Sequence, residues 1–156
     1  MRGPQLMAGY WQRPEETARA MLPGGWLRTG DLGRLAADGA LQLLDRVRDI
    51  VWVGGLPVAP SLVEEVVQRL AGVRECAAVA MPHPDGRDAG DALRLVVVRE
   101  SAAAAEPTEA QVRAHCERHL AGYQRPLAIE FRDALPRGGI GKVLREGAEL
   151  YRAESK

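Results

Sequence analysis

The sequence is poor in the features that mark secreted and membrane-spanning proteins. It contains only two cysteines among 156 residues. Because Cys76 and Cys116 do not form a Cys-x-x-Cys pair, they predict reduced thiols rather than a disulfide framework. No apolar run approaches the roughly 18 residues that a membrane helix needs, and Arg2 is not followed by the apolar stretch of a secretory signal. These absences predict a soluble, cytoplasmic protein with no membrane partner.

The chain also lacks an excess of charge of either sign. Its 21 basic side chains equal its 21 acidic ones in number, and no Lys/Arg cluster with interleaved aromatic residues occurs. A nucleic-acid or anionic-membrane surface would show such a cluster, so we expect no nucleic-acid partner. Small molecules or proteins are the expected partners. A chain of this length can bury one moderate core but cannot form a large two-domain enzyme.

Turn residues divide the first part of the chain into short strands. Between residues 26 and 50, apolar segments alternate with glycines, and Asp38-Gly39 between two strand-like runs is a strong hairpin signal. The β-branched and aromatic run over residues 50–53 is followed by Gly54-Gly55, which predicts a second turn and a return strand. A short helix is expected over residues 14–21, before this β-rich region.

The remainder alternates between helical and strand patterns. Ser61 and Glu64 form a capping box, and the valines that follow at helical spacing predict a helix that ends at Gly72. Thr108 and Gln111 form a second capping box and predict a second helix.

Valine-rich runs predict strands over residues 73–81 and 92–99, and a further strand is expected over 127–131. An amphipathic pattern over 142–151 predicts a terminal helix. The predicted fold class is α+β, with a small mixed β-sheet and flanking helices.

Three short motifs occur in order along the chain. They are Gly25-Trp26-Leu27-Arg28-Thr29-Gly30-Asp31-Leu32-Gly33, Asp45-Arg46-Val47-Arg48-Asp49 and Leu135-Pro136-Arg137-Gly138-Gly139-Ile140-Gly141-Lys142. Each is weak alone, but together they resemble the C-terminal part of the adenylate-forming ligase superfamily, which includes acyl/aryl-CoA synthetases, peptide-synthetase adenylation domains and luciferase-like enzymes. The resemblance implies that residues 49–156 form the C-terminal mobile lid domain of AMP-binding ligases. Residues 1–48 would be a β-rich strip from the last subdomain of the large N-terminal domain.

Asp31 and Arg46 are the candidate nucleotide-binding residues. A carboxylate that follows Thr-Gly can accept two hydrogen bonds from a ribose diol, although an isolated Thr-Gly-Asp is more often an Asx-turn. Arg46 and Arg48 would point to one face of an extended segment. Beside Asp45 and Asp49, such a pair is also typical of a solvated ion-pair cluster. The resemblance favours function, because in the family the matching Asp binds the ribose hydroxyls and the matching Arg lies near the ribose and phosphate.

Lys142 is the candidate catalytic residue. A loop lysine is usually a solvated surface charge, but the glycines before this one would let it reach into a cleft. There its ammonium group would stabilise the negative charge that develops when a carboxylate attacks the α-phosphate of ATP, as its family counterpart does. Gly138-Gly139-Ile140 replaces the usual Thr and small polar residues of the family, so we expect a looser loop.

The resemblance assigns two further roles. Asp49 would be the hinge about which the lid domain rotates between half-reactions. Gly54 and Gly55 would line the pantetheine tunnel once the lid has rotated, although a Gly-Gly pair is more commonly a simple hairpin turn.

The chain departs from the family pattern at four further positions. Asp45 replaces a usual Gly, Arg48 replaces a Lys, Leu62 replaces the first Glu of a Pro-x-Glu-Ile-Glu pattern, and Gln124 replaces a Lys. A change of Lys to Arg is not automatically conservative. These departures put the roles of the individual positions in doubt rather than the fold.

His115 and His119 lie four residues apart on a predicted helix and could share a metal ion. The zincin pattern fails, because no Glu directly follows the first His. We expect a solvated helix face with a half-buried Cys116, and no metal site.

The function implied by the resemblance requires a larger domain. In the family, the acid pocket, the phosphate loop and the Glu that helps hold magnesium lie in a region that has no counterpart here. The complete enzyme is expected to be an ATP-dependent carboxylic acid ligase that uses ATP with Mg²⁺, forms an acyl-adenylate (acyl-AMP) and then a thioester with CoA or the phosphopantetheine of an acyl carrier protein. The chain alone is expected to be inactive and to bind none of these tightly. The alternatives are a stand-alone, non-catalytic accessory or protein-binding module that keeps the lid fold, and a homodimer formed through exposed apolar surface.

Overall fold

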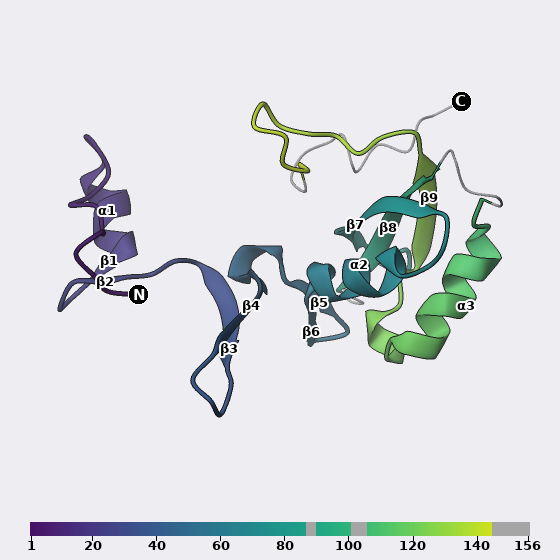
Figure 1. Cartoon of the computed structure of the whole chain (residues 1–156), viewed down its shortest axis with the longest axis horizontal. Helices are drawn as coiled ribbons and strands as arrows, with labels where there is room; N and C mark the ends of the chain where they lie inside the picture. The colour runs from purple at the N-terminus through teal and green to yellow at the C-terminus, as the bar shows by residue number, and fades with distance from the viewer. Residues whose placement is uncertain (87–89, 101–105, 145–156) are drawn as a thin grey trace.

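The computed structural model describes residues 1–86, 90–100 and 106–144. The elements up to the expected hinge are α1 (Pro14–Ala20), β1 (Met21–Leu22), β2 (Trp26–Leu27), β3 (Asp31–Leu35), β4 (Leu41–Arg46) and the 3₁₀ turn η1 (Val47–Asp49). Those after it are β5 (Val51–Val53), β6 (Leu56–Val58), α2 (Pro60–Gln68), β7 (Val73–Pro82), β8 (Asp91–Arg99), α3 (Glu109–His119), the 3₁₀ turn η3 (Gly122–Gln124) and β9 (Ala128–Arg132). Figure 1 shows the first group extended to one side of the second, in which helices pack beside a sheet.

The central sheet has the strand order β7-β8-β9. Strand β7 pairs antiparallel with β8, and β8 pairs parallel with β9. A parallel neighbour requires a long connection, and α3 lies within the connection between β8 and β9. The predicted α+β class, with a small mixed sheet and flanking helices, is confirmed, and the three predicted strands occur within one or two residues of their expected bounds.

Both faces of this sheet are buried, because side chains alternate along each strand. One face packs against α2 and α3 and contains Cys76, Ala78, Leu93, Leu95 and Val97, with Val63, Val67, Val112 and Cys116 from the helices. The opposite face contains Ala77, Val79, Val96 and Val98, and Leu135 packs on it from the segment after β9. The valine-rich runs are therefore typical of strands that are covered on two sides.

Both cysteines are free and buried. Cys76 fills the core as expected, whereas the half-buried position expected for Cys116 is wrong, since its side chain is 1% exposed. Burial raises the pKa of the Cys116 thiol, and the charge of Arg113 offsets part of this effect. A thiol with a raised pKa is a poor nucleophile at neutral pH, so Cys116 is a core residue.

The two predicted capping boxes have opposite outcomes. At α3 the box is present: Thr108 Oγ1 accepts from Gln111 N at 3.3 Å, and Gln111 Oε1 accepts from Thr108 N at 2.8 Å. At α2 it is wrong, because the helix begins at Pro60 after Ala59, which has no side-chain cap. The polar groups of the predicted box serve tertiary contacts instead. Glu64 is buried, and its Oε1 accepts from Ala78 N, on the open edge of β7, at 2.8 Å.

The predicted terminal helix over 142–151 is wrong at its start. Val143 forms an isolated antiparallel bridge with Arg137, so residues 142–144 belong to a returning loop, and the rest of the prediction lies outside the described residues. In the described part of the chain, no helix has the length and apolarity needed to cross a lipid bilayer.

Candidate functional site

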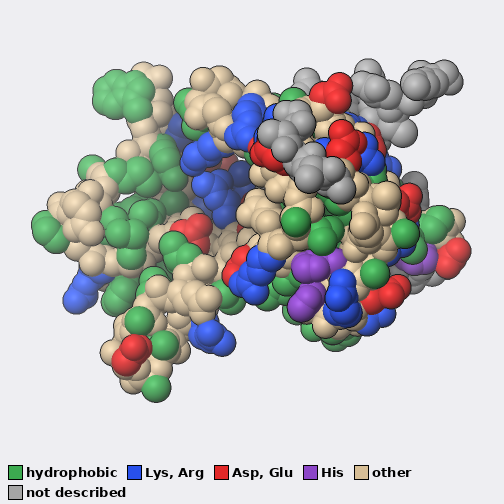
Figure 2. Space-filling model, turned by 45° about the vertical axis from the view of Figure 1, so that its right-hand side comes forward, with side chains coloured by type: hydrophobic (Ala, Val, Ile, Leu, Met, Phe, Trp, Pro, Cys, Tyr) green, Lys and Arg blue, Asp and Glu red, His purple; other side chains and the backbone are tan. Residues whose placement is uncertain are grey.

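Four of the six predicted site residues line one pocket. Asp31, Arg46, Asp49 and Lys142 all border a cleft of about 640 Å³, together with Leu43, Leu44, Asp45, Arg48, Gly138, Ile140, Val143 and Leu144. Figure 2 shows basic side chains gathered in the hollow between the N-terminal part and the rest of the molecule. Asp31 and Arg46 come from the β3–β4 hairpin, Asp49 from η1, and Lys142 from the loop after β9. The structure therefore brings the hairpin and η1, which are adjacent in sequence, together with a loop that lies far downstream of them.

The hairpin register explains why Asp31 and Arg46 are neighbours. Strands β3 and β4 are antiparallel, and Asp31 lies directly opposite Arg46. Directly opposed residues have Cβ atoms roughly 5 Å apart, so a carboxylate and a guanidinium flank the same side of the pocket. The turn of this hairpin is the predicted Asp38-Gly39 pair, in which Gly39 has a φ of +85° and Asp38 Oδ1 accepts from Ala40 N at 3.0 Å.

A bulge in the same hairpin connects it to α2. The register shifts between Leu32 and Gly33, which leaves Leu44 as an extra residue on β4. The Leu44 carbonyl accepts from Ser61 Oγ at 2.6 Å, and Asp45 Oδ2 accepts from Ser61 N at 3.0 Å. Asp45 therefore supplies the first turn of α2 with the carboxylate that Ala59 cannot provide. The sequence suggests Asp45 as an ion-pair partner of the nearby arginines and marks it as a departure from the family pattern, but it does not predict this contact with α2.

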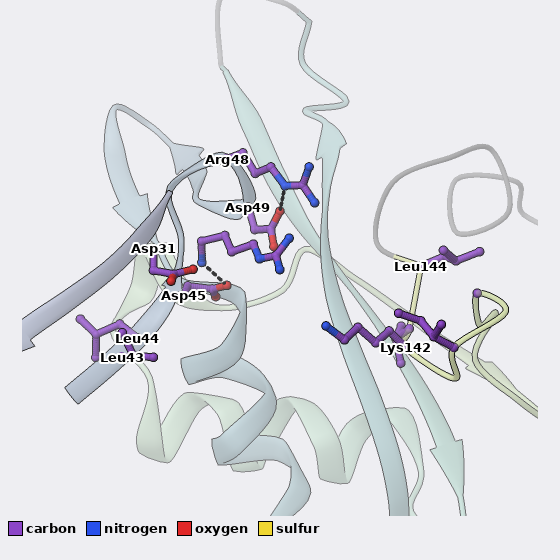
Figure 3. A pocket seen from close by; sticks show the side chains of 12 residues that line it. Asp31, Leu43, Leu44, Asp45, Arg48, Asp49, Lys142 and Leu144 are labelled. Carbon is purple, nitrogen blue, oxygen red and sulfur yellow. Dashed lines mark hydrogen bonds and ion pairs between the residues drawn. The ribbon is translucent and has the colours of Figure 1, made fainter. Parts of the chain in front are cut away.

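The segment with Arg46 and Arg48 is not extended as predicted. Residues Val47–Asp49 form the 3₁₀ turn η1, so the alternation of a strand does not apply to these two arginines. Arg48 Nε lies 3.5 Å from Asp49 Oδ1, and the Asp49 side chain is only 17% exposed. The expected pairing of this arginine with Asp49 is present (Figure 3).

Lys142 enters the pocket from the opposite wall. Figure 3 shows its side chain directed from the loop toward the side where Asp31, Asp45 and Asp49 lie. Lys142 itself is exposed, and no described residue forms an ion pair with its ammonium group. The pocket therefore offers an ammonium opposite a wall that carries carboxylates and guanidinium groups. This arrangement suits an anionic ligand that also carries hydroxyl groups, because each group has a partner of matching character.

Gly54 and Gly55 do not line this pocket. They form the two-residue turn between β5 and β6, with φ values of +55° and +79°. Positive φ at both positions is the geometry that favours glycine in a tight hairpin, so the hairpin interpretation is confirmed. Their predicted position in a pantetheine tunnel stays a prediction.

His115 and His119, the candidate metal ligands, contact the protein and each other. His115 Nε2 lies 2.9 Å from the Val66 carbonyl, and the two rings have centroids 4.6 Å apart. Within the described ranges, no group of three or more potential ligands could hold a metal ion.

Comparison with known proteins places the chain in a family. Residues 62–142 match the model of the AMP-binding enzyme C-terminal domain. This match covers more than half of the chain, which therefore belongs to that family. The chain is 41% identical to the long-chain-fatty-acid–CoA ligase of Salmonella typhimurium over 145 residues, which make up 93% of this chain and 25% of the relative. The chain thus spans about a quarter of the length of this curated relative.

Two solved structures share the fold. The o-succinylbenzoate CoA synthetase MenE from Bacillus subtilis, in complex with an acyl-adenylate intermediate, matches with a TM-score of 0.86 and 29% identity over 98% of this chain and 30% of that chain. The ATP-bound crystal structure of MatB from Rhodopseudomonas palustris matches with a TM-score of 0.83 and 35% identity over 97% of this chain and 30% of that chain.

A second structure of MatB bears on how the parts are arranged. Its apo form matches with a TM-score of only 0.64 at 36% identity, over 92% of this chain and 28% of that chain. Because both structures are of one protein, the difference between the two scores does not come from the MatB sequence. The arrangement described here is therefore closer to that of ATP-bound MatB.

Replacing Asp45 with alanine is expected to loosen the joint between the hairpin and α2. The change removes the carboxylate that accepts from Ser61 N, and loss of a helix cap lowers the free energy of unfolding by about 1 kcal/mol. Amide hydrogen exchange at Ser61 should accelerate. Asp38→Ala is the matched control, because its carboxylate bonds only within the hairpin turn. Equal exchange at Ser61 in both variants would contradict the assigned joint.

Proposed function

We propose that this chain is the C-terminal portion of an ATP-dependent carboxylic acid ligase, with residues 1–48 as a strip of the large AMP-binding domain and 49–156 as its mobile lid. The observation that supports it most strongly is the shared pocket of Asp31, Arg46 and Lys142. Family membership supports the same class, since the Salmonella relative is a CoA ligase. No residue among the first 50 is buried, as expected of a strip whose packing partners belong to another domain.

Lysine usage also supports the role of Lys142. The chain uses arginine for nearly all its basic residues, and Lys142 and Lys156 are its two lysines. A compact ammonium on a flexible stem differs from a planar guanidinium in reach and in hydrogen-bond geometry. A lysine in a chain that otherwise uses arginine therefore supports a requirement for the ammonium group. The same usage accounts for Arg48 at the position where the family has Lys.

The proposed chemistry assigns each pocket residue one task. Asp31 accepts hydrogen bonds from the ribose hydroxyls of ATP, and Arg46 lies beside the ribose and phosphate. A carboxylate oxygen of the acid attacks the α-phosphorus, and the bond from the α-phosphorus to the bridging oxygen breaks as pyrophosphate leaves with the electron pair. Lys142 stabilises the negative charge that develops on the phosphoryl oxygens. No cluster of metal ligands occurs within the described part of the chain, so Mg²⁺ would be bound by the large domain.

The second half-reaction requires a different arrangement. Rotation about Asp49 would withdraw Lys142 and present the Gly54-Gly55 turn to the pantetheine thiol of CoA or an acyl carrier protein, which then attacks the acyl carbonyl and releases AMP. A Cβ added at Gly54 or Gly55 would meet no atom within 4 Å in this arrangement. Space beside this turn is compatible with a tunnel that forms against another domain.

A reconstitution experiment tests the proposal. The chain is mixed with the large AMP-binding domain of its ligase, and pyrophosphate release is measured with ATP and a panel of carboxylic acids. We expect release that depends on both proteins and on the acid, and none from the chain alone. Binding without turnover would instead support the non-catalytic accessory module. Gel filtration of the isolated chain tests the homodimer alternative independently.

A further inference from the structure

The loop that carries Lys142 is closed by its own backbone. Gly138 N donates to the Lys142 carbonyl at 2.8 Å, Gly141 N donates to the Gly138 carbonyl at 2.8 Å, and Leu144 N donates to the Pro136 carbonyl at 2.9 Å. Lys142 therefore lies on the return arm of a small hairpin-like turn. The loop nevertheless contains three glycines, which leave the backbone more freedom than other residues would.

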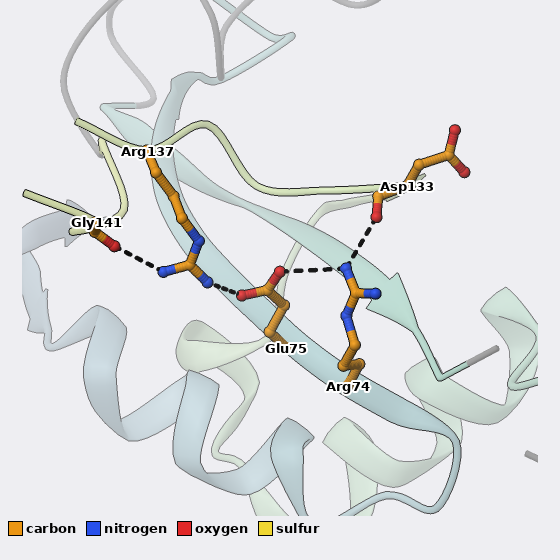
Figure 4. Close-up of polar contacts among 5 residues, drawn as sticks. All are labelled: Arg74, Glu75, Asp133, Arg137 and Gly141. Atoms are coloured by element: carbon orange, nitrogen blue, oxygen red, sulfur yellow. Dashed lines mark hydrogen bonds and ion pairs between the residues drawn. The ribbon is translucent and has the colours of Figure 1, made fainter. Parts of the chain in front are cut away.

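Arg137 restrains this turn through both terminal nitrogens of its guanidinium, which contact Gly141 and Glu75. We call this pair of contacts the brace. Its Nη1 donates to the carbonyl of Gly141 at 2.8 Å, and its Nη2 forms an ion pair and hydrogen bond with Glu75 Oε2 on β7 (Figure 4). Gly141 directly precedes Lys142 and has a φ of +77°. The planar fork of an arginine can hold two acceptors in a fixed relation, so the guanidinium ties the residue before Lys142 to the central sheet.

Glu75 is held in place from its other side. Arg74 Nη2 lies 3.5 Å from Glu75 Oε1 and donates to the Asp133 carbonyl at 3.0 Å. The register shift between Val73 and Glu75 makes Arg74 an extra residue on β7. Figure 4 shows the Glu75 carboxylate between the two guanidinium groups. Each arginine thus binds one backbone carbonyl of the segment after β9, and they share one carboxylate that is 20% exposed.

We propose that Arg137, held by Glu75, is the positioning residue for Lys142. Arg137 does not line the pocket, whereas Gly138, Ile140 and Lys142 do, so it acts on the site through the backbone of the loop. The glycines would otherwise let Lys142 sample many positions, and small misplacements of a reacting or stabilising group are costly to rate. The proposed role rests on the proposed function of Lys142, but the brace itself can be tested without any ligase activity.

A lysine-specific protease measures the brace directly in the isolated chain. Among residues 1–155 the sequence has one lysine, Lys142, so a protease that cuts after lysine has one site there, between Lys142 and Val143. Cleavage requires the loop to open, and its rate reports the open population. We expect Arg137→Met and Glu75→Gln each to accelerate cleavage by about 10-fold through loss of a charge-assisted contact.

Arg74→Met is the matched control for this measurement. It removes the other guanidinium from the same carboxylate but leaves the contact of Arg137 with Gly141, so cleavage should change by less than about 3-fold. Thermal melting of each variant checks that the fold is retained. An Arg137→Met chain that melts like the parent and is cut no faster would overturn the proposal. So would equal acceleration by Arg74→Met.

The ligase assay then tests positioning. With the large domain present, Arg137→Met should lower kcat for adenylate formation by about 10-fold while the KM for ATP changes less than about 2-fold. Thioester formation from supplied adenylate should be unaffected. A raised KM at constant kcat would make Arg137 a nucleotide contact and overturn its positioning role. If the parent enzyme forms no adenylate, the proposed function is wrong. The cleavage experiment still tests whether Arg137 and Glu75 restrain the loop.

Discussion

Lys142→Ala is expected to lower the rate of acyl-adenylate formation by about 10²- to 10³-fold, the effect of removing one group that stabilises developing charge in a transition state. The structure supports this expectation because Lys142 enters the same pocket as Asp31 and Arg46 from a separate wall. Thioester formation from supplied adenylate should fall by much less, since rotation about Asp49 would remove the lysine from the site. The two half-reactions are measured separately, by pyrophosphate release and by consumption of added adenylate.

Two further variants make this result specific. Lys142→Arg keeps the charge and changes its shape, so partial recovery would assign the effect to charge. Arg69→Ala removes an exposed cation at the C-terminal cap of α2 that pairs with Glu65 outside the pocket, and it should leave both half-reactions near the parent rate. Equal losses in adenylation and thioesterification for Lys142→Ala would exclude the assigned role.

Local signals in the sequence predicted most of the fold. The valine-rich runs that became β7 and β8, the Asp38-Gly39 turn and the Thr108 capping box depend on neighbours in the chain, and each is present in the structure. The predicted capping box at Ser61 and Glu64 is wrong because both residues form hydrogen bonds with partners that are distant in the sequence. Leu44 and Asp45 bind Ser61, and the open edge of β7 binds Glu64. A capping pattern cannot reveal that its polar groups have stronger partners elsewhere.

In the candidate site, too, the sequence predicted some residues and not the contacts that support them. The resemblance to the family predicted Asp31, Arg46, Asp49 and Lys142 as site residues, and all four line one pocket. Their catalytic roles stay predictions. The sequence does not predict the supporting contacts, because Glu75 follows a bulged residue on β7 and its partner Arg137 lies in a motif whose functional signal is the lysine. The signal that could have drawn attention to Arg137 is its position five residues before Lys142, at the start of a glycine-rich loop.

The expected looseness of that loop stays a prediction, and the structure shows contacts that act against it. Three glycines lower the cost of positive φ, which Gly141 adopts, but they do not by themselves leave the loop free. Backbone hydrogen bonds close the turn, and Arg137 ties it to Glu75. Side chains outside the glycine run therefore supply the restraint that the run itself lacks.

Asp31→Asn is expected to raise the KM for ATP by about 10- to 100-fold. Two charge-assisted hydrogen bonds to the ribose hydroxyls would become weaker neutral ones, and such bonds contribute about 1.5–3 kcal/mol each. The exposed position of Asp31 opposite Arg46 allows a ribose to approach. Asp38→Asn, in the turn of the same hairpin, is the matched control and should leave the KM unchanged.

A substrate with one ribose hydroxyl removed identifies the contact itself. The parent enzyme should use 2′-deoxy- or 3′-deoxy-ATP less well than ATP, because the Asp31 carboxylate then loses one of its two donors. The Asp31→Asn enzyme should discriminate much less, since residues and ligand groups that interact show non-additive effects. Additive losses would mean that Asp31 only closes the Thr29 to Asp31 turn, where Asp31 N donates to Thr29 Oγ1 at 3.2 Å. The ribose would then be recognised by the large domain, and this chain would contribute Lys142 to the reaction without holding the nucleotide.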